Sequence, residues 1–330
     1  MRSTVDGTRV AATRGSDVPS GVFPVRVHSV FRAAVNLRPP EGDLLTLLSA
    51  EADDMPRGVR LGSMEDFSSL GLVVGDMGVF AVDAIVLRPS GGLSAFRVDC
   101  AAARRIDSQS PPTLGGDRSR WGAGIALLDA LQKRAATDLR VAPLLLAAKP
   151  SGAMGERLTQ AALDLGRSVK ARRLDAMRGA AARLVGLGPG LTPAGDDFLC
   201  GFMYAGRCRA VARASRSRLL ARFDKAVGGL LGRTTDISAA MLRGALAGRV
   251  SCALTALAEA CAGVAGSDLE GAILRLAAVG HSSGLDAATG FFYGATIWGV
   301  EDRRTRRRAR LQQQRSPIVS SWRPLEDEDE

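Results

Sequence analysis

Lysine is nearly missing from this chain of 330 residues. Only four of its 44 basic residues are lysines (Lys133, Lys149, Lys170 and Lys225), and the others are arginines. Such a bias reflects a base-composition preference in the coding DNA. The net charge of +10 therefore does not by itself indicate a nucleic-acid partner.

Long apolar runs and paired cysteines are missing too. No run of about 18 apolar residues occurs, which excludes a membrane-spanning helix, and the polar start lacks the apolar core of a signal peptide. The five cysteines include no Cys-x-x-Cys pair, so neither a disulfide framework nor a zinc cluster is indicated. We expect a cytoplasmic chain with no membrane partner, metal or cofactor.

The composition is that of a folded protein with a sizeable core, since 46% of the residues are hydrophobic and 24% charged. Shifts in composition along the chain predict five parts. We expect a disordered leader at 1–20, a β-rich domain at 21–108, a linker at 109–120, a helical domain at 121–300 and a disordered charged tail at 301–330.

Short apolar stretches separated by turn residues predict strands in the first domain. They are Val25–Val30, Leu44–Leu48, Gly71–Val74, Val79–Leu87 and Ala95–Val98. Several short strands in so few residues indicate a small antiparallel barrel or sandwich.

The second domain has the apolar spacing of helices. Leu158, Ala161, Ala162, Leu165 and Val169 form one buried stripe, and similar patterns occur at 219–230, 237–248, 252–264, 268–279 and 285–298. Abundant small residues predict close helix packing. The fold class is therefore α+β, with a small β-barrel or sandwich followed by a compact helical domain.

The tail combines six arginines between 303 and 310 with a wholly acidic end at 326–330. Opposite blocks of charge with little apolar content predict a solvated, disordered segment. The arginines lack interleaved aromatic residues, so a nucleic-acid partner is not expected.

The most informative segment is the glycine-rich run 186–201, GLGPGLTPAGDDFLCG. Thr192 and Pro193 predict a helix start, with a hydroxyl cap followed by proline. A glycine-rich loop that enters a helix exposes backbone N–H groups at the positive end of the helix dipole, which suits an anion. No lysine follows as in a P-loop, and the glycine spacing is not that of a dinucleotide site.

Asp196 and Asp197 fall in the first turn of this predicted helix. They either complement the helix dipole or orient a substrate amide or a cation. Gly195 has no helix-propensity reason to be there, which favours a functional interpretation.

Two further segments resemble polar helix starts. One is Gly280–Gly290, which contains His281, Ser282, Ser283, Gly284 and Asp286, and the other is Thr234–Ser238. Capping explains these hydroxyls individually. If the three helix starts met, they would form a pocket rich in donors for a small dianion or a phosphate-bearing substrate.

The phrase Gly188–Asp197, GPGLTPAGDD, resembles a bacterial family whose best-understood members are AllH-type subunits of oxamate carbamoyltransferase. The resemblance extends to Val27–Leu37, Thr235–Arg249 and Gly280–Gly290. It covers about residues 22–298. The Ser-x-Arg-Thr motif of aspartate and ornithine carbamoyltransferases is absent.

The resemblance implies a subunit that works with an FdrA-type protein and a third, larger subunit. Together they convert oxalurate and phosphate into oxamate and carbamoyl phosphate, late in purine and allantoin breakdown. The implied ligand is a small anion, namely phosphate, carbamoyl phosphate, oxamate or oxalurate. A non-catalytic structural or anion-sensing subunit of such a complex is the alternative.

The resemblance also implies roles for individual residues. Asp196 or Asp197 would hold the ureido N–H groups, and His281 would protonate the departing nitrogen. The substrate-binding residues would be Gly188, Gly190, Leu191, Thr192, Gly195, Thr235, Ser238, Ser282, Ser283, Gly284 and Asp286. N–H groups that follow Gly190 and Gly284 would stabilise charge on the carbonyl oxygen.

Overall fold

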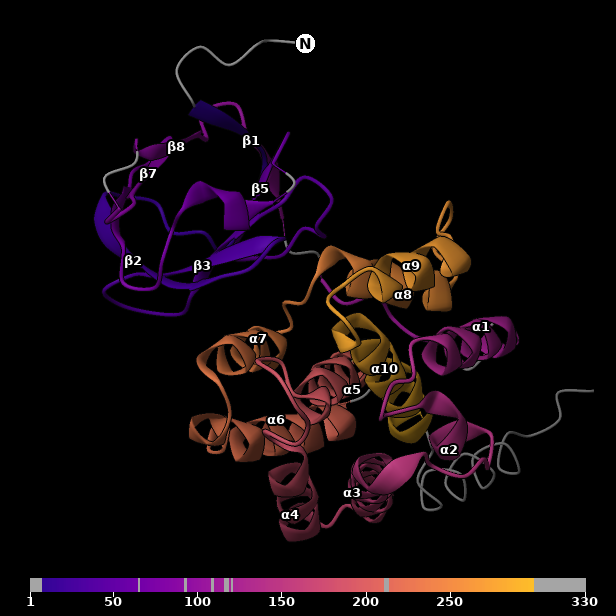
Figure 1. The fold of residues 1–330 in the computed structure, drawn as a ribbon. Coiled ribbons are helices and arrows are strands. Elements are labelled where there is room, and N and C mark those ends of the chain that lie inside the picture. The colour runs from indigo at the N-terminus through magenta and orange to yellow at the C-terminus, as the bar shows by residue number, and fades with distance from the viewer. Residues whose placement is uncertain are drawn as a thin grey trace, which may run out of the picture.

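A β-barrel lies beside a larger group of helices (Figure 1). The computed structural model describes residues 8–64, 66–91, 94–107, 110–115, 119, 121–210 and 214–299. The expected tail at 301–330, the first seven residues of the expected leader and part of the expected linker lie outside the described residues. No helix in the described part is long and apolar enough to cross a membrane.

The barrel consists of eight strands with a ninth added at its edge. The strands are β1 (Thr8–Gly15), β2 (Phe23–Val30), β3 (Ala34–Arg38), β4 (Leu45–Leu48), β5 (Gly58–Leu61), β6 (Met77–Phe80), β7 (Ala84–Arg88), β8 (Phe96–Asp99) and β9 (Arg104–Ile106). Their order is β5-β4-β3-β2-β6-β7-β8-β1, closed by antiparallel pairing of β1 with β5, and β9 pairs with β1. The pairs β1–β8, β1–β9 and β4–β5 are parallel, and the others are antiparallel.

The barrel closes around side chains that alternate along its strands. Leu37, Leu47, Leu61, Phe80 and Ile85 are among those that fill the interior, each at most 1% exposed. This is the expected core of a small barrel, in which inward and outward residues alternate. The predicted β-rich domain is thus a barrel.

The prediction of a disordered leader is wrong from residue 8 onward, because β1 (Thr8–Gly15) closes the barrel. Its buried positions are Ala11, Thr13 and Gly15. A Cβ at Gly15 would lie 2.2 Å from the Pro56 carbonyl oxygen, so this strand needs a small residue there. Such small inward residues give β1 little of the apolar signal from which strands are predicted.

Two other strand predictions also need correction. The predicted strand Val79–Leu87 is the hairpin β6–β7, in which the Ala81 amide donates to the Ala84 carbonyl at 2.7 Å. Gly71–Val74 forms no strand but a loop, which follows the short 3-10 helix Phe67–Leu70. The Asp76 carboxylate accepts hydrogen bonds from the Val73 and Ser90 amides and fixes this loop instead.

The described helices follow the predicted stripes closely. They are α1 (Trp121–Arg134), α2 (Val141–Leu145), α3 (Gly152–Ala171), α4 (Leu174–Leu184), α5 (Ala194–Ala210), α6 (Ala214–Gly228), α7 (Asp236–Leu246), α8 (Cys252–Ala262), α9 (Leu269–Ala277) and α10 (Ser283–Trp298), with a 3-10 turn at Leu231–Arg233. The α+β class is confirmed.

Helices α5 and α10 form the centre of the helical domain (Figure 1). A Cβ at Gly201 would lie 1.9 Å from the Ala287 carbonyl oxygen, and one at Gly290 would lie 2.0 Å from the Phe198 carbonyl oxygen. Only glycine allows this approach of two backbones. Residue numbers rise together along the two helices, so they run parallel and their N-termini lie at the same end.

Polar contacts join the barrel to α7 and α8. Asp43 of the barrel forms an ion pair with Arg243 of α7. At the start of α8, the Ala253 amide donates to the Asp53 carboxylate at 2.7 Å, and the Cys252 amide donates to the Asp54 carbonyl at 2.9 Å. Barrel residues thus cap a helix of the other domain, which fixes how the two domains are placed.

Candidate functional site

The glycine-rich loop connects α4 to α5. Gly186, Gly188 and Gly190 have φ angles of 73°, 125° and 85°, a region that side chains other than glycine rarely adopt. A Cβ at Gly186 would also lie 2.7 Å from the Arg233 carbonyl oxygen. The sequence folds into this loop because three of its positions require glycine.

The loop exposes unused backbone donors. Within the described part of the chain, none of the amides of Gly188, Gly190, Leu191 and Thr192 donates a hydrogen bond. By contrast, the Gly195 amide donates to the Leu187 carbonyl at 2.9 Å, which closes the loop. Consecutive free amides in a glycine-rich loop form a concave site for an anion.

The helix after the loop begins one residue later than predicted. The Asp197 amide donates to the Pro193 carbonyl at 3.2 Å, so Pro193 takes the position expected for Thr192. The Thr192 hydroxyl instead makes a hydrogen bond to the Ser283 hydroxyl at 2.7 Å. Thr192 therefore links two helix starts and does not cap α5.

The three predicted helix starts meet in the structure. The Thr192–Ser283 hydrogen bond joins the starts of α5 and α10. The Thr235 hydroxyl donates to the Leu191 carbonyl, and it also accepts from the Ser238 amide at 3.1 Å as the N-cap of α7. Segments about 40 and 90 residues away in the sequence thus converge on one loop.

Asp196 holds this junction together. Its two carboxylate oxygens accept hydrogen bonds from the Gly186 amide, at 2.9 Å, and from the Thr234 hydroxyl. Burial raises the pKa of Asp196, and the hydroxyls of Thr234 and Ser238 and the Gly186 amide oppose that rise. Because its oxygens are engaged, Asp196 positions the loop and α7.

Asp197 and Asp286 are buried side by side at the starts of α5 and α10, and each is about 1% exposed. Burial and the charge of Asp286 raise the pKa of Asp197 well above its usual range, whereas the Ser283 hydroxyl lowers it. Burial raises the pKa of Asp286 to about 8. Two such carboxyl groups do not both ionise near neutral pH.

The carboxyl oxygens of this pair are incompletely partnered. Oδ2 of Asp197 and both oxygens of Asp286 are buried without a hydrogen-bond partner among the described residues. An unpartnered carboxylate is costly in a protein interior, whereas a carboxylic acid is tolerated. Burial therefore favours the protonated, neutral form of both carboxyl groups.

Two of the predicted substrate-binding glycines have a packing role. A Cβ at Gly195 would lie 2.1 Å from the Leu184 carbonyl oxygen, and one at Gly284 would lie 1.9 Å from the Leu276 carbonyl oxygen. Both residues are buried. The need for close backbone approach explains these glycines without a ligand.

His281 and Ser282 precede α10. His281 is exposed and contacts none of the three aspartates through a hydrogen bond or ion pair within the described residues. It lies two residues from Ser283, so it stands near the rim of the junction and not inside it.

The sequence reasoning missed a contribution from the barrel. Nε2 of His28 lies 3.4 Å from a carboxylate oxygen of Asp236, the first residue of α7, and Arg38 forms an ion pair with the same oxygen. His28 lies on β2, where a histidine in a strand is most simply interpreted as structural. Its position in the segment Val27–Leu37, which carries the family resemblance, was the available signal.

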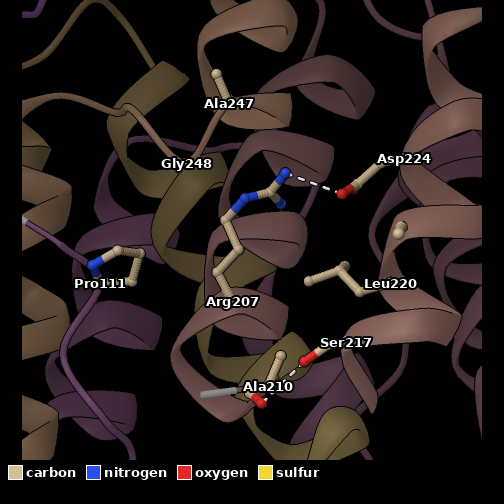
Figure 2. Close-up of a pocket in the computed structure, with 9 residues that line it drawn as sticks. Pro111, Arg207, Ala210, Ser217, Leu220, Asp224, Ala247 and Gly248 are labelled. Carbon is tan, nitrogen blue, oxygen red and sulfur yellow. Dashed lines mark hydrogen bonds and ion pairs between the residues drawn. The ribbon is translucent and has the colours of Figure 1, made fainter. Parts of the chain in front are cut away.

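A pocket of about 380 Å³ lies elsewhere, between the C-terminal part of α5 and α6. Figure 2 shows Arg207 pointing across it toward Asp224, at 2.9 Å. Arg207 also donates to the Leu246 and Met203 carbonyls. This arginine is fully engaged in joining α5 to α6 and α7, and none of the predicted site residues lines the pocket.

No group of three or more histidine, cysteine, aspartate and glutamate residues in the described part is placed to hold a metal ion. All five cysteines are free, and four of them are buried. The groups present at the site are backbone amides and hydroxyls, beside the buried carboxyl groups.

Two family models match the chain. Oxamate carbamoyltransferase subunit AllH matches residues 184–295, which include the glycine-rich loop and all three helix starts, and the AllH family N-terminal domain matches residues 6–105, which include the eight barrel strands. No curated protein and no solved structure matches. The two matches cover both domains in the expected order. The chain therefore belongs to the AllH family of oxamate carbamoyltransferase subunits.

Proposed function

We propose that this chain is the subunit of a carbamoyltransferase complex that holds the reacting carbamoyl or phosphate group on its glycine-rich loop. The unused amides of Gly188, Gly190, Leu191 and Thr192, at the junction of three helix starts, carry the proposal. The reaction is the phosphorolysis of oxalurate to oxamate and carbamoyl phosphate, in purine and allantoin catabolism. The proposed partners are an FdrA-type subunit and a third, larger subunit, and the proposed compartment is the cytoplasm.

The loop fits the charge that this reaction develops. A phosphate oxygen attacks the ureido carbonyl carbon of oxalurate, and negative charge grows on the carbonyl oxygen before the bond to the oxamate nitrogen breaks. Fixed amides stabilise such charge without reorganising at the moment of reaction. The amides of Gly190 and Leu191 are exposed donors of this kind.

The departing oxamate nitrogen takes up a proton as its bond to the carbonyl carbon breaks. His281 is exposed beside the start of α10 and supplies that proton from the rim of the site. Asp197 and Asp286 are buried, and the Ser283 hydroxyl bonds to Asp197, so the pair acts through this hydroxyl. In this proposal they are positioning residues, and Ser283 and Thr192 face the substrate.

Replacing Ser283 by alanine in the reconstituted complex tests the proposal. The variant loses the Thr192–Ser283 hydrogen bond and the donor to Asp197, and we expect kcat to fall by about tenfold or more because a positioned donor is removed. Ser267→Ala is the matched control. Its exposed hydroxyl bonds only to the nearby Val264 carbonyl, and carbamoyl phosphate production should not change.

A non-catalytic, anion-sensing subunit is the second candidate. The burial of all three aspartates favours it, since none of them is open to substrate in this structure. Full activity of the Ser283→Ala complex would support this candidate and contradict a substrate site on the loop.

A further inference from the structure

A second, larger pocket adjoins the glycine-rich loop. It is open, has a volume of about 950 Å³ and lies between α3, the end of α4 and the segment before α3. Gly186 and Leu187 of the loop line it, together with Arg233, whose backbone lies close to Gly186. None of the residues predicted to bind substrate lines it, so the proposed function does not account for it.

The charges around this pocket are mainly positive. Arg157 from α3, Arg183 from α4 and Arg233 line it, against one acidic residue, Glu156. Arg183 is paired with Asp164 at 2.6 Å. Arg157 and Arg233 are exposed and form no ion pair with any described residue. Two guanidinium groups are thus free to bind an anion, and arginine suits carboxylate and phosphate oxygens in particular.

The wall of the pocket also contains an unused buried polar group. Thr159 lines the pocket and is only 5% exposed, and its hydroxyl has no hydrogen-bond partner among the described residues. Gln160 beside it is exposed and offers an amide. A buried hydroxyl without a partner in a native protein calls for an explanation such as a ligand.

The Asp196 carboxylate connects the pocket to the loop. Asp196 binds the Gly186 amide, which belongs to the pocket wall, and the Thr234 hydroxyl, which follows Arg233 directly. A ligand that drew Arg233 inward would therefore pull on the same carboxylate that fixes the loop. This connection places the pocket in a position to act together with the site on the loop.

We propose that this arginine pocket binds a small anion that carries a carboxylate or phosphate group on an uncharged body. Arg157 and Arg233 contact the anionic oxygens, the Thr159 and Gln160 side chains contact the polar body, and Ala161, Ala182 and Val185 contact its uncharged face. That this anion is a substrate or product of carbamoyl transfer rests on the proposed function. The binding of an anion does not.

Calorimetric titration of the full chain with inorganic phosphate and with oxamate tests the pocket. We expect saturable binding of at least one probe at a site separate from the loop. The double variant Arg157→Gln/Arg233→Gln should weaken it by about tenfold or more, since hydrogen bonds to charged groups are lost. Arg178→Gln removes an exposed arginine of α4 that does not line the pocket, and it should bind as the unchanged chain does.

Three results would contradict the proposed anion pocket. They are no saturable binding of either probe, binding by the double variant as tight as by the unchanged chain, or a loss of affinity in Arg178→Gln as large as in the double variant. Stronger binding of oxamate identifies a carboxylate site, and stronger binding of phosphate identifies a phosphate site. The proposed function fails separately. If the double variant loses binding while Ser283→Ala keeps full activity in the complex, the anion pocket is supported and the loop mechanism is contradicted. If the double variant binds as before while Ser283→Ala loses activity, the loop mechanism is supported and the anion pocket is contradicted.

Discussion

Three buried carboxyl groups lie below the glycine-rich loop, and their surroundings separate their roles. Both carboxylate oxygens of Asp196 accept hydrogen bonds that fix the loop and the start of α7. Asp197 and Asp286 lack partners for most of their oxygens, and burial raises the pKa of each. A pair of this kind keeps at least one proton at neutral pH.

Replacing Asp286 by asparagine tests this view of the pair. The pKa of Asp286 is about 8 in the folded chain, against an ordinary value of 3.8. Between about pH 4 and pH 8 the Asp286 carboxyl group is ionised in the unfolded chain but protonated in the folded chain. The folded chain therefore loses stability as the pH rises through this range, and the stabilising contribution of Asp286 is complete only below about pH 4. Asparagine stays neutral. The variant should therefore gain stability relative to the unchanged chain by roughly a few kcal/mol at pH 8.

Thermal unfolding of both chains at pH 4 and pH 8 measures this difference. Asp175→Asn, an exposed acid in the first turn of α4, serves as the control and should leave the pH profile unchanged. A difference in Tm between Asp286→Asn and the unchanged chain that is the same at both pH values would contradict a protonated Asp286.

At the scale of elements, the parallel pair α5 and α10 sets the site, because it brings two helix N-termini together beneath one loop. The apolar stripes of the helices could be read from the sequence, since long periodic patterns are the strongest local signal. The strand β1 could not, because Thr8–Gly15 has few apolar residues and is recognised only by its pairing with β5 and β8. The meeting of Thr192 with Ser283 was hypothesised, but only the packing of α5 on α10 fixes it.

The glycines of this helix pair should not tolerate a methyl group. In Gly201→Ala the new Cβ would lie 1.9 Å from the Ala287 carbonyl oxygen, and the helices would have to separate. We expect a loss of about 2–4 kcal/mol in the free energy of unfolding. Gly179→Ala in α4 is the matched control, since nothing lies within 4 Å of its added Cβ, and it should stabilise the chain by about 0.5–1 kcal/mol. Urea unfolding measures both, and equal effects would refute the close packing.

At the scale of the whole molecule, the barrel extends the site and anchors the helices. His28 and Arg38 reach Asp236 at the start of α7, while Asp53 caps α8 from the barrel. The domains could be placed in order from the sequence, because strands precede helices. Their contact could not, since it depends on single polar residues about 200 positions apart.

The hydrogen bond from the Ala253 amide to Asp53, which caps α8 from the barrel, should contribute measurably to the free energy of unfolding. Asp53→Ala removes the acceptor for the Ala253 amide, and we expect the free energy of unfolding to fall by about 1 kcal/mol, as for the loss of an N-cap. Glu51→Ala changes an exposed residue of the same loop and should have no effect. Chemical unfolding followed by far-UV circular dichroism reports both. A fall as large in Glu51→Ala would show that the loop, and not the cap, carries the contact.

The most direct test of the central claim is a titration with carbamoyl phosphate followed by 1H–15N NMR. The signals to follow are those of the loop amides. Amides that hold the reacting group should shift on binding, namely those of Gly188, Gly190, Leu191 and Thr192. The amides of Gly263 and Gly266, in the turn after α8, should stay in place. Saturable shifts confined to the loop are the predicted result, and an unchanged loop in a complex that still makes carbamoyl phosphate would contradict the account.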